Sequence, residues 1–174
     1  MGSVINYANL ARDLQVSPPT VKKWVEILED LYVVFVVRPY AKNFSKALLK
    51  GPKVYFYDIG RVPDSAARLE NLVAYHLLKR NYFLQDTKGI DAQLYFYRDK
   101  EKREVDFVLT NANKITHAIE VKTSDNNLSP SLNYFTERTA TAESLQLVYQ
   151  LKRERHLGEN RIVELADFLA TLET

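Results

Sequence analysis

The chain has 174 residues, of which 46% are hydrophobic and 26% charged, and its formal net charge at pH 7 is +2. That length and hydrophobic content are enough for a buried core, so we expect one main domain with a small appendage. The absence of cysteine excludes disulfides and thiolate zinc sites and fits a reducing, cytoplasmic compartment. No apolar run approaches the length of a membrane span. The five glycines form neither a Walker A loop nor a dinucleotide-binding fingerprint, which excludes P-loop binding of ATP.

The N-terminal segment has the layout of a winged helix-turn-helix domain, which we place at residues 1–59. The sequence predicts a helix over residues 7–14 and a second helix that is capped by Ser17 and opened by two prolines. Two strand-like runs, residues 32–37 and 53–57, are expected to flank a wing.

The second helix is expected to present one apolar and one polar face. Its inward face is predicted from apolar residues at helical spacing: Val21, Trp24, Val25 and Leu28. Its outward face is predicted to hold Thr20, Lys22, Lys23 and Glu26. If this helix enters the major groove of DNA, Lys22 and Lys23 contact phosphates. The acidic residues that follow suit packing against a protein partner equally well.

A third helix is predicted over residues 64–80. Its apolar stripe consists of Leu69, Leu72, Val73 and Leu77, and Glu70 falls at the edge of that stripe. From the residues alone, Glu70 can be a cap-flanking or salt-bridged glutamate at the surface.

A strand over residues 93–98 leads into a hairpin that carries two acids on its strands. The runs 105–110 and 115–122 alternate as strands do, and residues 111–114 between them are typical of a turn. If the hairpin is centred on Asn113, Asp106 lies opposite Glu120 and shares one face with Lys122. The other face then holds Val105, Phe107, Ile119 and Val121. A shift of one residue would separate the two acids.

The remaining elements complete a mixed sheet. We expect a helix over residues 128–138, a strand over 145–149 parallel to its neighbour, an edge strand over 161–165 and a last helix over 166–172. The order is a helix, three antiparallel strands, a helix and a parallel strand.

The paired carboxylates indicate a metal site. Mg²⁺ is usually held by one or two carboxylates with water and phosphate oxygens, and Mn²⁺ accepts the same ligands. A lysine on the same face can stabilise charge that develops on a phosphate. The alternative is a pair of solvated acids on an exposed face. The acids Asp106 and Glu120 interrupt apolar runs, where an isolated charge is costly, and this weighs against that alternative.

These strands resemble the PD-(D/E)XK nuclease superfamily, with Glu104-Val-Asp-Phe-Val-Leu109 followed by Ala118-Ile-Glu-Val-Lys122. Val105 stands where the superfamily name implies proline. Further stretches are similar to the domain that follows the ATPase module in many bacterial and archaeal AAA-type ATPases, a family catalogued as domain of unknown function 4143. These stretches are residues 6–14, 16–22, 28–31, 52–58 and 70–73.

The resemblance implies an α/β chain, with the winged helix-turn-helix followed at residues 60–174 by a restriction-endonuclease-like core around a mixed central sheet. It implies Mg²⁺ or Mn²⁺ held by Asp106, Glu120 and Glu70, directly or through water, with Lys122 assisting the attacking water. One expected function is a metal-dependent DNA endonuclease attached to an ATPase module. The other is an inactive module that docks the ATPase on DNA or on a protein partner.

Overall fold

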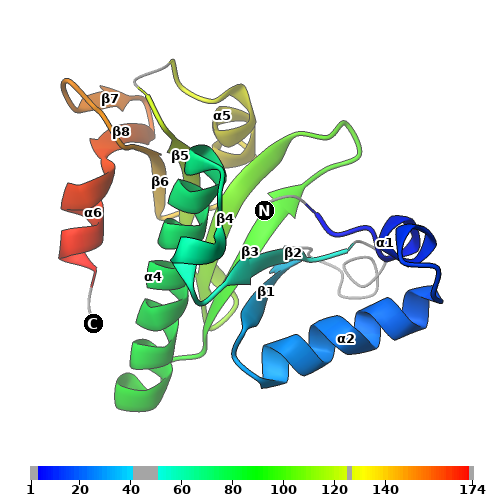
Figure 1. The fold of residues 1–174 in the computed structure, drawn as a ribbon. Helices are drawn as coiled ribbons and strands as arrows, with labels where there is room; N and C mark the ends of the chain where they lie inside the picture. The colour runs from blue at the N-terminus through cyan, green and yellow to red at the C-terminus, as the bar shows by residue number, and fades with distance from the viewer. Residues whose placement is uncertain (1–3, 41–50, 125–126, 173–174) are drawn as a thin grey trace.

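A computed structural model of the chain describes residues 4–40, 51–124 and 127–172. It is a mixed α/β fold built on one eight-stranded sheet of order β2-β1-β3-β4-β5-β6-β8-β7 (Figure 1). The helices are α1 (Tyr7–Asp13), α2 (Pro18–Asp30), α4 (Ser65–Lys88), α5 (Pro130–Thr136) and α6 (Leu165–Thr171), with a 3₁₀ turn η1 (Ile59–Arg61). The strands are β1 (Val34–Pro39), β2 (Lys53–Phe56), β3 (Ala92–Arg98), β4 (Glu104–Asn111), β5 (Lys114–Lys122), β6 (Glu143–Val148), β7 (Arg155–Leu157) and β8 (Asn160–Glu164).

Helices cover both faces of the sheet and give it two hydrophobic clusters. The larger cluster packs Val73, Ala74 and Leu77 of α4 and Leu165 of α6 against one face (Figure 1). The smaller cluster packs Leu132 and Phe135 of α5 against strands on the opposite face. The sheet is therefore buried on both sides near its centre, where a charged side chain needs a partner.

The predicted order of elements after residue 64 is confirmed, with three corrections. Strands β3, β4 and β5 are antiparallel, and β6 follows α5 and lies parallel to β5. Helix α4 runs to Lys88 rather than Arg80, because its buried stripe continues and the helix ends only at Gly89, whose φ is +63°. Strand β8 lies inside the sheet, parallel to β6, and the short strand β7 was missed and forms the edge.

The strands of the hairpin pair in the predicted register, but the residues next to the turn pair in a different one. Strands β4 and β5 pair Phe107 with Ile119 and Leu109 with His117, which is the register centred on Asn113. The turn itself pairs Asn111 with Lys114, a register one residue out of step. The extra residue that reconciles them is Thr116, a β-bulge in β5. If the register of the turn continued along both strands, Phe107 would pair with Ala118 instead of Ile119.

A second bulge in β4 corrects the predicted faces of that strand. Tyr95 of β3 pairs with Val108 but Tyr97 pairs with Val105, so β4 has one extra residue between these pairs. Val105 consequently packs in the α5-side cluster, while Phe107 packs in the α4-side cluster. The prediction that the two share a face was wrong. The extra residue lies at Asp106 or Phe107, beside the predicted site.

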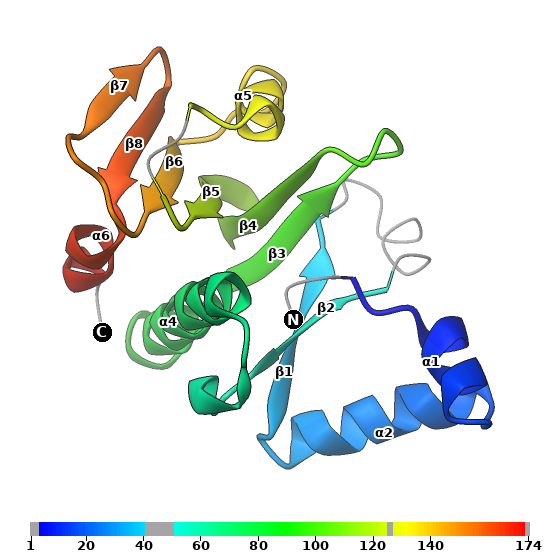
Figure 2. The same cartoon turned by 45° about the horizontal axis from the view of Figure 1, so that its top comes forward.

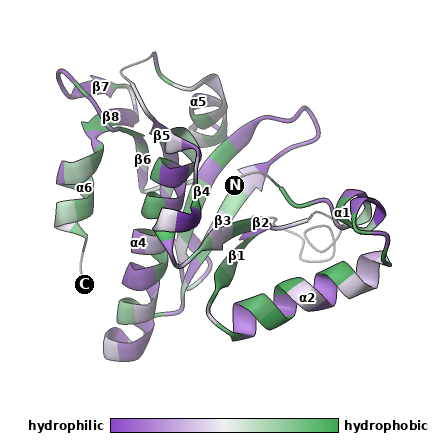
Figure 3. Ribbon diagram, in the orientation of Figure 1, coloured by the Kyte–Doolittle hydropathy of each residue, from purple (hydrophilic) through white to green (hydrophobic). Residues whose placement is uncertain are grey.

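Helix α2 lies at the margin of the molecule and packs on α1 and β1 (Figure 2). Its cap is as predicted, since Ser17 accepts a hydrogen bond from the Thr20 amide. Val21 is buried, but the inward placement of Trp24 and Leu28 was wrong, because Trp24 is 44% exposed and Leu28 is exposed as well. Hydrophobic residues recur along this marginal helix (Figure 3). Most of the predicted wing, residues 41–50, lies outside the described residues.

Across the described residues, no helix combines the length and the apolar character that crossing a membrane requires.

Candidate functional site

Three carboxylates from two elements converge on one buried ammonium group. The Nζ atom of Lys53 lies 2.7 Å from Glu104 Oε1, 3.1 Å from Glu70 Oε1 and 3.3 Å from Asp106 Oδ1. The lysine side chain is 1% exposed. Burial by itself lowers the pKa of Lys53, but the charges of Asp106, Glu70 and Glu104 outweigh it and raise the pKa above its ordinary value. Lys53 is therefore an ammonium ion at neutral pH.

The alternation of strand β2 brings Lys53 and Tyr55 to the same buried face. Tyr55 donates its hydroxyl hydrogen to Glu70 Oε1 over 2.7 Å and is fully buried against Phe107. Burial, followed by the nearby charge of Glu70, raises the pKa of the Tyr55 hydroxyl well above its ordinary value. The hydroxyl remains protonated and acts as a fixed donor to the carboxylate.

Glu70 is held over the sheet by the residue that follows it. The side-chain amide of Asn71 donates to the Phe56 carbonyl and accepts from the Phe56 amide, both over 2.8 Å. This pair of hydrogen bonds ties α4 to strand β2. Burial first, and the charge of Asp106 second, raise the pKa of Glu70, while Lys53 opposes the shift. Glu70 was predicted at the edge of the apolar stripe of α4. In the structure its carboxylate lies between α4 and strand β2 of the sheet.

Glu120 and Lys122 form a second group beside the first. Lys122 donates from Nζ to Glu120 Oε1 over 2.6 Å. The other oxygen of this carboxylate, Oε2, is buried and accepts no hydrogen bond from any described residue. Burial and then the charge of Asp106 raise the pKa of Glu120 to about 7, against the opposing effect of Lys122. Burial lowers the pKa of Lys122, but Glu120 outweighs it, so Lys122 is also an ammonium ion.

Asp106 connects the two groups. Its Oδ1 atom contacts Lys53, and its Oδ2 atom accepts a hydrogen bond from the Val121 amide over 3.0 Å. The bulge in β4 allows a side chain of this strand to reach the α4 side of the sheet while it also contacts β5. Its charge is among the causes that raise the pKa values of both Glu70 and Glu120.

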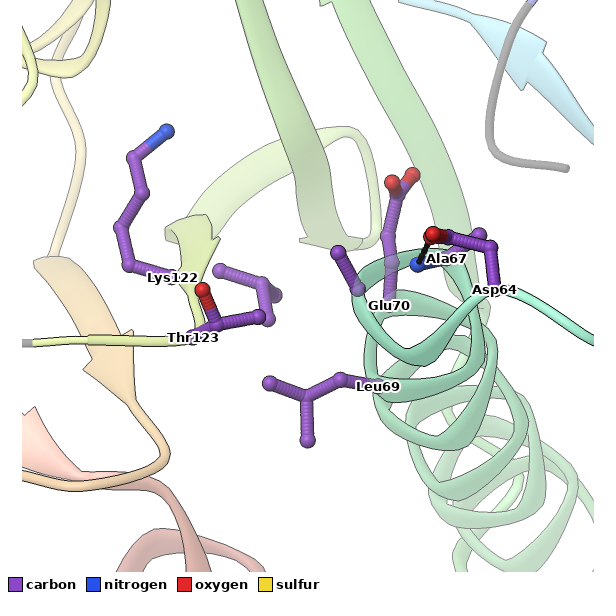
Figure 4. Close-up of a pocket in the computed structure, with 8 residues that line it drawn as sticks. Asp64, Ala67, Leu69, Glu70, Lys122 and Thr123 are labelled. Atoms are coloured by element: carbon purple, nitrogen blue, oxygen red, sulfur yellow. Dashed lines mark hydrogen bonds between the residues drawn. The ribbon is translucent and has the colours of Figure 1, made fainter.

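A pocket of about 350 Å³ opens beside these groups, between the first turns of α4 and the end of β5. Its lining residues are Asp64, Ala66, Ala67, Leu69, Glu70, Val121, Lys122 and Thr123. Glu70 and Lys122 lie on opposite walls, and their charged ends point in the same direction (Figure 4). Glu70 and Lys122 are therefore the two residues of the cluster that line this pocket.

The structure brings together four of the predicted site residues and places three elsewhere. Asp106, Glu120, Lys122 and Glu70 form the cluster described above. The predicted DNA contacts Thr20, Lys22 and Lys23 lie on α2, on the other side of β1 (Figure 2). Lys22 is exposed and lies 3.8 Å from Glu26, and the Thr20 hydroxyl hydrogen-bonds that of Ser17.

Sequence reasoning missed Lys53, Tyr55 and the role of Glu104. A signal for Lys53 was available, since a lysine in an alternating strand needs a buried counter-charge by the same argument that singled out Asp106. Its partners are 17 or more residues away, so no local pattern identified them.

The donor set suits a hard divalent cation with few protein ligands. Among the described residues, no group of three or more Asp, Glu or His side chains has the arrangement of a metal site. Two carboxylates with water and phosphate oxygens are nevertheless the usual protein contribution to a Mg²⁺ site. Asp106 and Glu120 can supply these, and the unpaired Glu120 Oε2 is a buried oxygen that lacks a partner. The residues present therefore fit such an ion.

Comparison with known proteins gives two family matches and two relatives. Residues 1–72 match the domain of unknown function DUF8612. The uncharacterized protein Rv2008c of Mycobacterium tuberculosis and the uncharacterized protein Mb2031c of Mycobacterium bovis are each 25% identical to this chain over 178 residues. Each alignment covers 98% of this chain, which spans 40% of the length of these relatives. No solved structure matches.

The second family match lies over the elements that form the site. The model of the domain of unknown function DUF4143 matches residues 66–168, more than half of the chain. This region runs from the first turn of α4 to helix α6 and includes Glu70, Asp106, Glu120 and Lys122. The chain belongs to the DUF4143 family.

Proposed function

We propose that this chain carries a metal-dependent DNA endonuclease site of the PD-(D/E)XK type. In this proposal Asp106 and Glu120 hold one Mg²⁺ or Mn²⁺ ion, and Glu70 contributes directly or through water. Lys122 stands beside the reacting phosphate. The pocket between α4 and β5 admits the phosphodiester.

The observation that carries this proposal is the buried, unpaired Oε2 atom of Glu120. An acceptor oxygen that is buried without a partner costs on the order of 1–3 kcal/mol, and more if it is charged. Asp106 increases that cost because its negative charge acts on the same carboxylate. A divalent cation between the two carboxylates would remove both penalties. No interaction within the described residues explains the arrangement as well.

Each residue then has a distinct role in hydrolysis. A bound ion would supply the chemistry of lowering the pKa of a water and offsetting phosphate charge. In hydrolysis the water oxygen bonds to phosphorus, the phosphorus–oxygen bond to the leaving group breaks, and the leaving oxygen gains a proton. Lys122 is held as an ammonium ion by Glu120, so it acts as a charge or a proton donor rather than as a base. Asp106 is oriented by Lys53 and the Val121 amide.

The N-terminal segment and the wider protein context belong to the same proposal. We propose that residues 1–59 form a winged helix-turn-helix that contacts DNA through Thr20, Lys22 and Lys23. The exposure of α2 supports a contact surface there. We also propose that the full-length protein contains an AAA-type ATPase module and acts in the cytoplasm. The longer relatives leave room for such a module.

A second candidate function is a catalytically inactive module that docks the ATPase on DNA or on a protein. One observation favours it, namely the apolar side chains exposed on α2, which include Trp24, Ile27 and Leu28. Exposed apolar residues that gather on one helix are typical of an interaction surface.

The two candidates separate in one experiment. Mg²⁺ and Mn²⁺ are titrated calorimetrically into the wild type, and the same samples are tested for nicking of supercoiled plasmid DNA. We expect metal binding and nicking in the wild type. We expect loss of both in the Asp106→Ala, Glu120→Ala variant, and loss of nicking with retained metal binding in Lys122→Ala.

The matched control removes two exposed acids, Asp86 and Glu159, by substitution with alanine. This control carries the same charge change and should behave as the wild type does. Absence of metal binding and of nicking in the wild type would exclude the nuclease and leave the docking module.

A further inference from the structure

The contacts of Lys53 are those that a metal ion would make in a carboxylate site. Its ammonium group lies within 3.3 Å of carboxylate oxygens from Glu70, Glu104 and Asp106. It has given up its water to do so, since the side chain is almost fully buried. A lysine ammonium is a compact, strongly hydrated point charge, and desolvation of such a charge requires strong counter-charges in return.

The charges of the cluster leave room for one divalent ion. The cluster contains four carboxylates, from Glu70, Glu104, Asp106 and Glu120. Three cations oppose them, namely Lys53, Lys122 and Arg98, which lies 3.5 Å from Glu104. One negative charge remains. One divalent ion would make the cluster singly positive, which a phosphodiester anion balances, whereas two ions would leave it with three positive charges.

The hydrogen-bond partners of the carboxylate oxygens also indicate room for one divalent ion. Glu104 contacts Lys53 through Oε1 and Arg98 through Oε2. Glu70 Oε1 accepts from both Lys53 and Tyr55. In contrast, Glu120 Oε2 accepts no hydrogen bond within the described part of the chain. Among the described atoms of these carboxylates, the buried oxygen that lacks a partner thus belongs to Glu120, which does not contact Lys53.

From these contacts we infer that Lys53 takes the place of one cation of a two-cation phosphodiesterase site, so that the chain binds a single divalent ion between Asp106 and Glu120. Two-metal sites hold ions about 3.5–4 Å apart that share a clamp on the substrate. Here Asp106 is the shared ligand, with Lys53 on one side and the metal on the other. Lys53 is a positioning residue, and Glu70 acts on the metal through water. The inference rests on the proposed function for the presence of any metal.

The test counts bound Mn²⁺ ions per chain by electron paramagnetic resonance at saturating Mn²⁺, which needs no nuclease activity. We expect one ion in the wild type, two in Lys53→Met and one in Lys53→Arg, which restores the positive charge. The control Lys114→Met removes an exposed lysine from the hairpin turn and should retain one ion. Circular dichroism with and without Mn²⁺ follows folding of each variant.

The outcomes separate this inference from the proposed function. Two ions in the wild type would overturn the inference and leave the nuclease proposal intact. No ion in the wild type would overturn the nuclease proposal, and the inference with it. Lys53→Met that folds only with Mn²⁺ and then binds two ions supports the inference. Lys53→Met that binds one ion, or that stays unfolded at saturating Mn²⁺, overturns it.

Discussion

The carboxylate cluster and the α1–α2 pair differ in which side chains they bury. The cluster buries charge, and Lys53 is 1% exposed although it is a lysine. The α1–α2 pair and the residues after it expose apolar groups, with Leu31 66% and Tyr32 71% exposed. Burial of charge and exposure of apolar side chains both cost free energy in an isolated chain. Exposed apolar patches are typical of interaction surfaces. The difference indicates that the cluster pairs most of its charges within the chain and leaves Glu120 Oε2 open to a small ion, whereas the helical pair presents a surface for contact with another molecule.

The largest expected effect comes from removal of Lys53. In the absence of metal, Lys53→Met leaves three carboxylates beside each other without their common cation, and we expect a loss of about 3–5 kcal/mol in the free energy of unfolding. Urea denaturation in EDTA measures it, with Lys114→Met as the control. A loss below 1 kcal/mol would mean that the acids do not depend on this ammonium.

The next effect concerns the attachment of α4 to the sheet. Asn71→Ala removes two hydrogen bonds to the Phe56 backbone in a fully buried place, and we expect a cost of about 2–3 kcal/mol. Urea denaturation with Gln93→Ala, at an exposed position of β3, as the control tests this expectation. Because Glu70 adjoins Asn71, the affinity for Mn²⁺ should fall together with stability, and retention of both would contradict the proposed tie.

The third effect is a dependence of stability on pH. The pKa of Glu120 is raised to about 7 in the folded chain, so the protonated carboxyl stabilises the fold below the unfolded pKa. This contribution is lost as pH rises through about 7. Without metal, we therefore expect the wild type to lose on the order of 2 kcal/mol relative to Glu120→Gln between about pH 4.5 and pH 7.5.

Urea denaturation of the wild type and Glu120→Gln in EDTA, at several pH values across that pH range, tests this expectation. Parallel pH profiles for the two proteins would show that Glu120 titrates normally. Saturating Mn²⁺ should flatten the difference, because an ion favours the ionised carboxylate.

The smallest effect is expected on the α2 surface. Ile27→Ser and Leu31→Ser change exposed side chains, so stability should alter by no more than about 0.5 kcal/mol each. Thermal denaturation checks this, with Val21→Ser as the contrasting buried position on the same helix. A loss above 1.5 kcal/mol at Ile27 or Leu31 would place these residues in the core and remove the contrast between the two regions.

The sequence predicted most of the elements because their signals are local. Ser17 marked the start of α2, and the alternation of residues 105–110 and 115–122 marked β4 and β5. The cluster was predicted in part for the same reason, since Asp106, Glu120 and Lys122 lie on one hairpin. Lys53 could not be placed with them, because its partners depend on which strand lies beside which in the folded sheet.

The faces of two elements were predicted wrongly for a related reason. Periodicity gives the relative direction of side chains, but not what lies on each side. Trp24 follows the inward spacing of α2, yet the structure leaves it exposed. Val105 follows the alternation of β4, yet a bulge places it on the other side of the sheet.

The bulge at Thr116 separates the register of the hairpin tip from the register of the strands beyond it. Ala112 and Asn113 form the tip with φ values of 47° and 64°, and the register beyond the bulge is set by the strands rather than by the tip. Extra residues inserted at the tip would extend the loop and leave Asp106 and Glu120 together. Deletion of the single residue Thr116 would make the pairs Thr110–Ile115 and Leu109–His117 consecutive, so the ladder would become regular and Phe107 would stay opposite Ile119. Homologous chains with a working site are therefore expected to vary in length at the tip and at Thr116, and to keep the pairing of Phe107 with Ile119.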